Sequence, residues 1–204
     1  MKRVFFAALF LLGFISNSFA AEYPWRLKKN EQGIQVRVRK VEDSPILEYK
    51  GTVVVDASMD KVVAFYEDTK RMTEWFHQCS ESKMLEQKSP DDKILYFAIR
   101  MPWPVSDRDS VYERVRTKDP ATGAMEYHAS VRPNVYPLQN GRIRMPRVKG
   151  IWRFTPLPDG RTEVYYQQHG DVGGYIPAWL VNQLAVNIPF NTLLNLRRLL
   201  TSKN

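Results

Sequence analysis

Residues 173–200, GGYIPAWLVNQLAVNIPFNTLLNLRRLL, decide the fold because they carry the longest helical pattern in the chain. Pro177 suits the first turn of a helix, where a missing N–H costs nothing. Apolar side chains then recur every three or four residues, which predicts one long amphipathic helix. The members of this apolar stripe are Leu180, Leu184, Ile188, Leu193, Leu196 and Leu200.

Pro189 stands in the middle of this predicted helix. Because proline removes one backbone hydrogen bond and crowds the preceding turn, a kink is expected there. One interpretation is a packing helix that bends to follow a curved sheet. The other is a lid over a cavity, with Gly174 and Pro177 at its entry and Pro189 as its hinge.

The first twenty residues have the pattern of a secretory signal peptide. Lys2 and Arg3 precede an apolar run, and Ser18 and Ala20 place small residues where a signal peptidase cleaves. Cleavage after Ala20 would leave one domain at residues 21–204, exported across the inner membrane and most simply periplasmic.

The net charge of the 204-residue chain is +8, and removal of Lys2 and Arg3 lowers it to +6. This mild excess suits transient contact with an anionic membrane surface. The chain carries no motif typical of nucleic-acid binding.

Between residues 22 and 172 the pattern is mostly that of strands. A short helix is expected at 22–30, an amphipathic helix at 58–68 behind the N-cap Ser58, and a short turn around Trp75. Alternating segments separated by turns predict an antiparallel meander; they cover 34–39, 46–56, 80–87, 93–101, 110–117, 125–131, 148–155 and 162–168. The proline-rich segment 132–147 is either an interrupted strand or a mobile loop. The order predicts an α+β fold, a curved antiparallel sheet wrapped around the C-terminal helix.

The loop 101–109, MPWPVSDRD, is the most distinctive one. Asp107 and Asp109 flank Arg108, so a local charge-assisted network is expected. Arg108 shares its parity with Tyr112 and Arg114 on the following strand. Whether that face points inward or to solvent is open at this point, because buried arginines are costly unless paired or hydrated.

Signals for catalysis are poor. The three histidines, His77, His128 and His169, lack the spacing of metal ligands. Cys79 is the single cysteine, so an intramolecular disulfide is excluded, and a buried structural role is the simpler interpretation. No catalytic residue, metal or cofactor is therefore assigned.

Together, PWPVSDRD at 102–109, HGDVGGYIPAWLVN at 169–182 and the pair Leu196-Arg197 resemble the START domain, the steroidogenic-acute-regulatory-related lipid-transfer family. The resemblance covers about residues 30–200 and implies the helix-grip fold with a tunnel for one lipid. Arg108 and Asp109 match the family's Arg-Asp pair. Arg114 matches an arginine that in some members lies in the cavity and pairs with an acid, although strand 94–100 offers no acid here. The entry to the lid helix matches at Gly174, Pro177, Trp179 and Leu180.

The function expected from this resemblance is the binding of a hydrophobic ligand, a lipid, in an internal cavity, and its carriage between membranes. The alternatives are an enzyme similar to polyketide cyclases that uses the same cavity, and an interaction module with a filled core. The predicted cavity residues are Tyr96, Arg108, Tyr112, Arg114, Tyr127, Trp152, Leu180, Leu184 and Ile188; the predicted lid and hinge residues are Gly174, Pro177 and Pro189.

Overall fold

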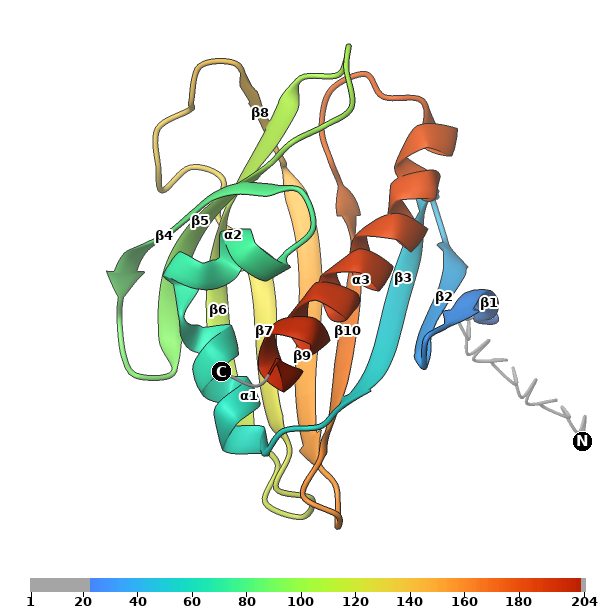
Figure 1. Ribbon diagram of the computed structural model, residues 1–204. Coiled ribbons are helices and arrows are strands. Elements are labelled where there is room, and N and C mark those ends of the chain that lie inside the picture. Colours follow the sequence, from blue (N-terminus) through green and yellow to red (C-terminus); the bar gives the residue numbers. More distant parts are fainter. Residues whose placement is uncertain (1–22, 203–204) are drawn as a thin grey trace, which may run out of the picture.

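A single curled sheet organises the computed structural model, which describes residues 23–202 (Figure 1). Its strands follow the order β1-β2-β3-β10-β9-β7-β6-β5-β4, and each neighbouring pair along that path is antiparallel. The strands are β1 (Arg26–Glu31), β2 (Ile34–Val41), β3 (Ser44–Val55), β4 (Cys79–Gln87), β5 (Asp92–Ile99), β6 (Asp107–Lys118), β7 (Met125–Val131), β8 (Arg142–Arg144), β9 (Arg147–Pro156) and β10 (Thr162–Asp171). The α+β prediction is confirmed.

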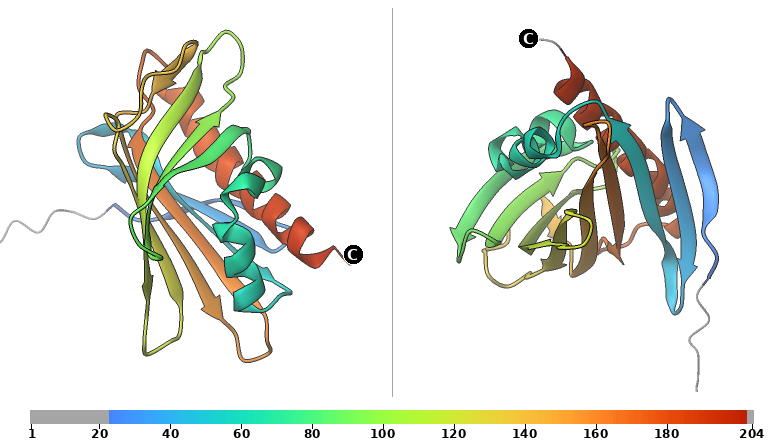
Figure 2. Two further views of the ribbon diagram at one scale, coloured as in Figure 1. Left: turned by 90° about the vertical axis from the view of Figure 1, so that its left-hand side faces the viewer. Right: turned by 90° about the horizontal axis from the view of Figure 1, so that it is seen from below.

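The helices lie on the concave side of the sheet (Figure 2). Helix α1 (Met59–Glu67) begins at Ser58, whose side chain accepts a hydrogen bond from the backbone of Lys61, as the N-cap pattern predicts. A 3-10 turn, η1 (Thr69–Arg71), and a short helix, α2 (Met72–Trp75), follow it. The long helix α3 (Ala178–Thr201) crosses the sheet and packs mainly on β3 and β2. None of the helices in the 23–202 range is long and apolar enough to cross a bilayer.

Helix α3 continues through Pro189, which is buried against β3. Its C-terminal half buries Leu193, Leu196 and Leu200, as the leucine spacing predicts. In the N-terminal half the buried positions are Val181 and Ala185, one residue beyond the predicted stripe. The predicted stripe follows the larger leucine and isoleucine side chains, whereas the N-terminal half of the helix turns the smaller Val181 and Ala185 toward the sheet.

Two expectations about local structure are wrong or incomplete. The expected helix at 22–30 is strand β1, which pairs with β2 through a turn at Gln32 and Gly33. Both turn residues have positive φ, 51° and 70°, as two-residue hairpin turns require. Segment 132–147 contains β8, which runs parallel to the start of β6. The predicted signal peptide at 1–20 lies outside the described residues.

Candidate functional site

Two small cavities lie between the concave face of the sheet and the helices. The inner cavity, about 50 Å³, is lined by Trp75, Ser110, Tyr112, Arg114 and Trp152 among others. The outer cavity, about 60 Å³, reaches α3 and is lined by residues that include Met101, Met145, Leu184, Ala185 and Ile188. Of the residues predicted to line a ligand cavity, the inner cavity includes Tyr112, Arg114 and Trp152, and the outer cavity includes Leu184 and Ile188.

Aromatic side chains separate the two cavities. Phe76 and Phe97 line both, and their ring centroids lie 5.8 Å apart in an edge contact. A cavity of about 150 Å³ holds one benzene molecule, so each of these spaces is too small for a hydrocarbon chain as it stands. Methionines such as Met72 and Met101 border the cavities, and their unbranched thioethers repack readily. The interior can widen only if these side chains change rotamer or α3 moves.

Arg114 brings a positive charge into the inner cavity. The residue is 4% exposed, and its guanidinium carbon lies 5.2 Å from the ring centre of Tyr66 and 5.5 Å from that of Tyr127. Among the described residues, neither an aspartate nor a glutamate lines this cavity. The β6 face that carries Arg114 therefore points inward, which the sequence left open, and cation–π contact compensates only part of its desolvation.

Three polar atoms at the inner cavity are buried without a hydrogen-bond partner within the described part of the chain. They are Nη2 of Arg114, Oγ of Ser110 and Nε1 of Trp75. A buried donor without a partner is costly, so native structures rarely leave one unless something else completes it. Two of the three atoms can only donate, and the third can do so. The site is therefore prepared for an acceptor group, most favourably an anionic oxygen.

The tyrosines around Arg114 are neutral at physiological pH. Burial raises the pKa of Tyr112 to about 12, and the charge of Arg114 offsets only part of the effect. Burial likewise raises the pKa of Tyr66 and of Tyr166. These phenols hold their protons, so they can donate hydrogen bonds but cannot serve as bases.

Arg108 ties the loop before α3 to the sheet and does not line either cavity. Its Nε and Nη2 donate to the carbonyl oxygens of Val172 and Gly173, at 3.2 and 2.9 Å. The expected charge-assisted network of Arg108 with Asp107 and Asp109 is wrong, because the side chain of Asp109 faces the other side of the sheet. There its carboxylate accepts two hydrogen bonds from Arg144, at 2.7 and 3.1 Å. Gly174, with a φ of 68°, lies against the guanidinium of Arg108.

Three other predicted cavity residues lie elsewhere. Tyr96 is on the convex face, where its ring packs 5.2 Å from that of Tyr136, so its prediction as a cavity residue is wrong. Its strand is buried on both faces, which hides the direction of each side chain from a sequence pattern. Leu180 is half-buried and lines neither cavity, because α3 turns Val181 inward instead. Tyr127 stands behind Arg114 and donates a 2.6 Å hydrogen bond to Glu67.

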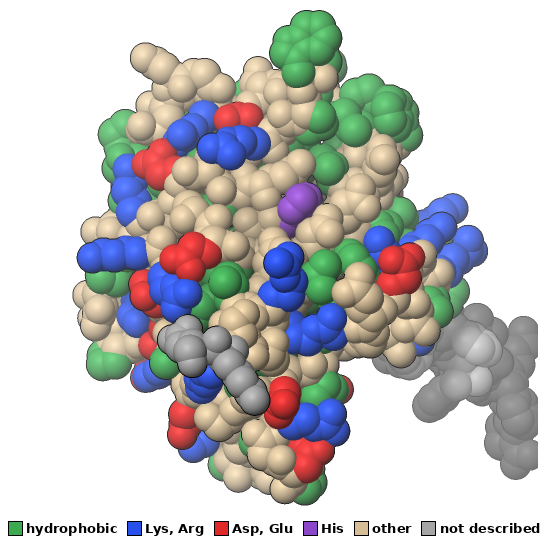
Figure 3. Space-filling model, in the orientation of Figure 1, with side chains coloured by type: hydrophobic (Ala, Val, Ile, Leu, Met, Phe, Trp, Pro, Cys, Tyr) green, Lys and Arg blue, Asp and Glu red, His purple; other side chains and the backbone are tan. Residues whose placement is uncertain are grey.

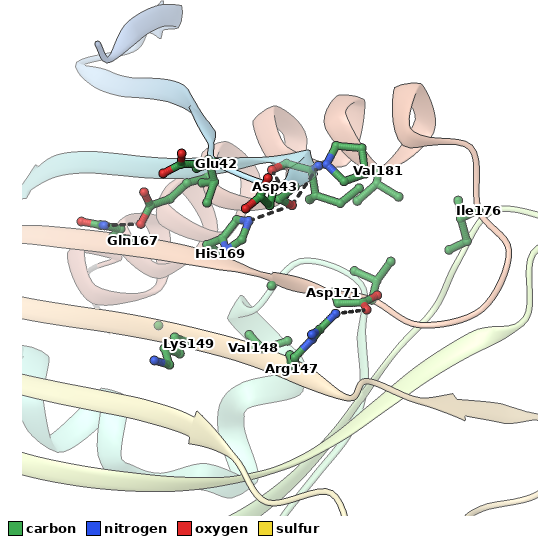
Figure 4. A pocket seen from close by; sticks show the side chains of 18 of the residues that line it. Glu42, Asp43, Arg147, Val148, Lys149, Gln167, His169, Asp171, Ile176 and Val181 are labelled. Atoms are coloured by element: carbon green, nitrogen blue, oxygen red, sulfur yellow. Dashed lines mark hydrogen bonds and ion pairs between the residues drawn. The ribbon is translucent and has the colours of Figure 1, made fainter. Parts of the chain in front are cut away.

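A larger groove, about 770 Å³, opens beside the outer cavity (Figure 4). It lies between the β2–β3 hairpin and the ends of β9 and β10, and His169 and Asp171 project into it. The groove was not predicted from the sequence, because it depends on where two distant strands stop pairing. The cavity residues Trp75, Ser110, Phe76 and Phe97 were not predicted either. Of these, only Ser110 carries a sequence signal, because it alternates in step with Arg114 and so lies on the same face of β6.

Large hydrophobic side chains project from one end of the molecule, at the loop before β6, the loop before α3 and the first turn of α3 (Figure 3). The aromatic members are Trp103, 92% exposed, Trp179, 68% exposed, and the fully exposed Tyr175. Leu138, in the β7–β8 loop, is also largely exposed. Tryptophan and tyrosine prefer the interface between membrane and water.

The model of the START domain family matches residues 13–202. The chain belongs to the START domain family. A START domain accounts for the element order and for the sheet that grips the C-terminal helix. The fold and family expected from the sequence motifs are thus confirmed.

Relatives of this START domain include lipid transfer proteins. A crystal structure of a STAR-related lipid transfer protein from Xanthomonas axonopodis is 38% identical and superposes with a TM-score of 0.81, covering 87% of this chain and 99% of the other. An uncharacterised protein of Pseudomonas aeruginosa is 38% identical over 96% of this chain and 95% of its own length. Human phosphatidylcholine transfer protein is 27% identical over 85% and 82% of the two chains. The family and these relatives support lipid binding.

Proposed function

We propose that this START domain binds one lipid in its interior, with the polar end of the lipid at Arg114, and carries it between membranes. The observation that carries the proposal is the set of buried donors without partners on Arg114, Ser110 and Trp75. An anionic or carbonyl oxygen of a lipid would complete them. The acyl chain would then lie toward the outer cavity and α3, gaining about 0.8 kcal/mol for each buried CH₂.

The lipid must enlarge the interior that it enters. Phe76 and Phe97 would rotate apart and merge the two cavities, and the bordering methionines would repack. A widened interior keeps the apolar lining that a hydrocarbon chain needs. The ligand-free protein is then a collapsed state, stabilised by aromatic contacts that the lipid replaces.

A carrier explains the interior better than an enzyme does. General-base catalysis needs a group that ionises near neutral pH. Among the described residues, no Asp, Glu, His, Lys or Cys lines the inner cavity, and burial raises the pKa of its tyrosines. The arrangement can hold an oxygen and does not offer a base to remove a proton from it.

The exposed aromatic end is the proposed contact with the membrane. Trp103 lies in the β5–β6 loop, Tyr175 just before α3 and Trp179 in the first turn of α3. The outer cavity is lined by Met101 and Val181, which are close to them in the chain. Replacing Trp103 and Trp179 by serine should reduce co-flotation with vesicles of phosphatidylglycerol and phosphatidylethanolamine. Serine in place of Tyr23, an exposed aromatic in the N-terminal segment, is the matched control and should leave flotation unchanged. Equal flotation of all three proteins would remove this surface from the account.

Periplasmic location is part of the same proposal. Export would follow from the signal at residues 1–20, and the mass of the protein recovered from a periplasmic extract should correspond to a chain that begins at Ala21. Recovery of the full-length chain in the cytoplasmic fraction would contradict it.

The lipid itself can be identified directly. Native mass spectrometry of the purified mature protein should show one bound ligand per chain, and organic extraction should release an amphiphile with an acidic or carbonyl oxygen. A protein that stays ligand-free from expression and takes up none from mixed vesicles would overturn the proposal.

A further inference from the structure

The sheet divides between β3 and β10. These strands pair from Val55 and Thr162 as far as Tyr49 and Gln168. Beyond that point β3 continues only with β2, whereas β10 continues only with β9 as far as Asp171. The groove of about 770 Å³ occupies the gap between the diverging strands (Figure 4).

The groove and the outer cavity share their walls. Ile46, Val172 and Val181 line both of them, as do Gly170 and His169. The groove and the interior share these residues at the place where β3 and β10 no longer pair. Val148 lines both the groove and the inner cavity, so the apolar lining of the interior continues toward solvent at this residue.

Side chains close the division in place of a strand ladder. The backbone N–H of Leu47 donates to Oδ1 of Asn182 on α3 at 2.9 Å, and Nδ2 of Asn182 donates to the carbonyl of Pro45 at 3.2 Å. Nε2 of His169 lies 3.3 Å from Oγ of Ser44. We call these contacts the straps. They join the β2–β3 hairpin to α3 and β10, and each can break without disturbing the paired part of the sheet.

We propose that the division between β3 and β10 is the portal through which the lipid enters, and that the groove holds the far end of its hydrocarbon chain. The inference rests on the proposed lipid binding. The inner and outer cavities are both small, so a hydrocarbon chain anchored at Arg114 must extend outward past the outer cavity. The groove lies at the end of that path. Charged side chains of both signs, such as Glu42, Asp43, Arg147 and Lys149, stand at its rim and stay in water while the chain lies on the apolar wall.

A reversible cross-link across the straps tests the portal. Pro45→Cys and Asn182→Cys are combined in a Cys79→Ala background, and a short bis-methanethiosulfonate reagent joins the hairpin to α3. The matched control carries His77→Cys and Asn191→Cys, whose parent side chains lie 3.4 Å apart and tie the middle of α3 to the segment after α2. The probe is dansyl-undecanoic acid, which becomes fluorescent in an apolar site, and its uptake rate is measured before linking, after linking and after reduction.

Linking across the straps should slow uptake at least about tenfold, since the gate can no longer open. Reductant should restore the rate, which shows that the substituted chain is folded. The control link should change the rate less than about twofold by the same reasoning. Uptake that is unaffected by the strap link, or slowed only by the control link, would overturn the portal and leave lipid binding intact. If the unlinked protein takes up no probe, lipid binding itself fails and the portal with it.

Discussion

Leu193 of α3 rests directly on the backbone of Gly51 in β3. A β-carbon on Gly51 would lie 2.7 Å from Cδ1 of Leu193 and 3.5 Å from Cβ of Pro189, so the glycine lets helix and sheet approach each other. This contact fixes the C-terminal half of α3, whereas side-chain straps hold the N-terminal half. The two halves therefore differ in how firmly they are attached.

Gly51→Ala should push α3 off the sheet. The added methyl group must displace Leu193, and overpacking of a core typically costs about 1–3 kcal/mol in the free energy of unfolding. Urea denaturation measures the loss. Gly150→Ala is the control, since its β-carbon would meet nothing nearer than 3.5 Å. Equal losses for both variants would show that the close approach does not matter.

Pro189→Ala should slow release of the lipid. Proline cannot donate the helical hydrogen bond at this position, so α3 is weakest here, and alanine restores the bond. The rate at which dansyl-undecanoic acid leaves the protein for acceptor vesicles is the measurement. An unchanged rate would remove Pro189 as a hinge and leave it as a packing residue.

The cluster around Glu67 should make the fold sensitive to acid. Burial opposes ionisation of this carboxylate, but the hydrogen bond from Tyr127 and the charges of Lys93 and Arg116 outweigh it and lower its pKa below 4.5. A lowered pKa in the folded state stabilises the protein above 4.5, and that stability is lost as the pH falls through the folded value. Tyr127→Phe should therefore flatten the dependence of unfolding free energy on pH between about pH 5 and pH 3. The same slope in both proteins would contradict the assignment.

Cys79 should react slowly in the native protein. Burial raises the pKa of its thiol to about 11, so little thiolate is present at neutral pH, and the residue is 7% exposed. Ellman's reagent should modify the folded chain far more slowly than the urea-unfolded chain. Comparable rates would show that the start of β4 opens readily.

The sequence predicted most of the fold because alternation and helical spacing are local signals. Strand β1 was not predicted because Leu27 stands among charged residues on an edge strand that buries little. Strand β8 was not predicted because its three residues pair in parallel with the distant β6. The order of the other elements followed from turns and caps such as Ser58.

The candidate site was predictable only in part. Parity placed Tyr112 and Arg114 on one face, but the choice between inside and outside depends on how the sheet curls. Tyr96 was assigned to the wrong face because its strand is buried on both faces, so no alternation shows which side chains point inward. The groove depends on where β3 and β10 stop pairing, a long-range property that no short pattern records.

The most direct test of the account is the amount of lipid that co-purifies with Arg114→Met, measured by native mass spectrometry beside the parent chain. Removing a hydrogen bond to a charged group should weaken retention by about 1.5–3 kcal/mol, roughly 10- to 150-fold in the dissociation constant. Thermal stability of the ligand-free protein should hold or rise, because a buried charge is replaced by an apolar side chain. Arg116→Met removes a charge from the same strand outside the cavity and should keep its lipid. Equal lipid content in Arg114→Met and the parent protein would contradict the central claim.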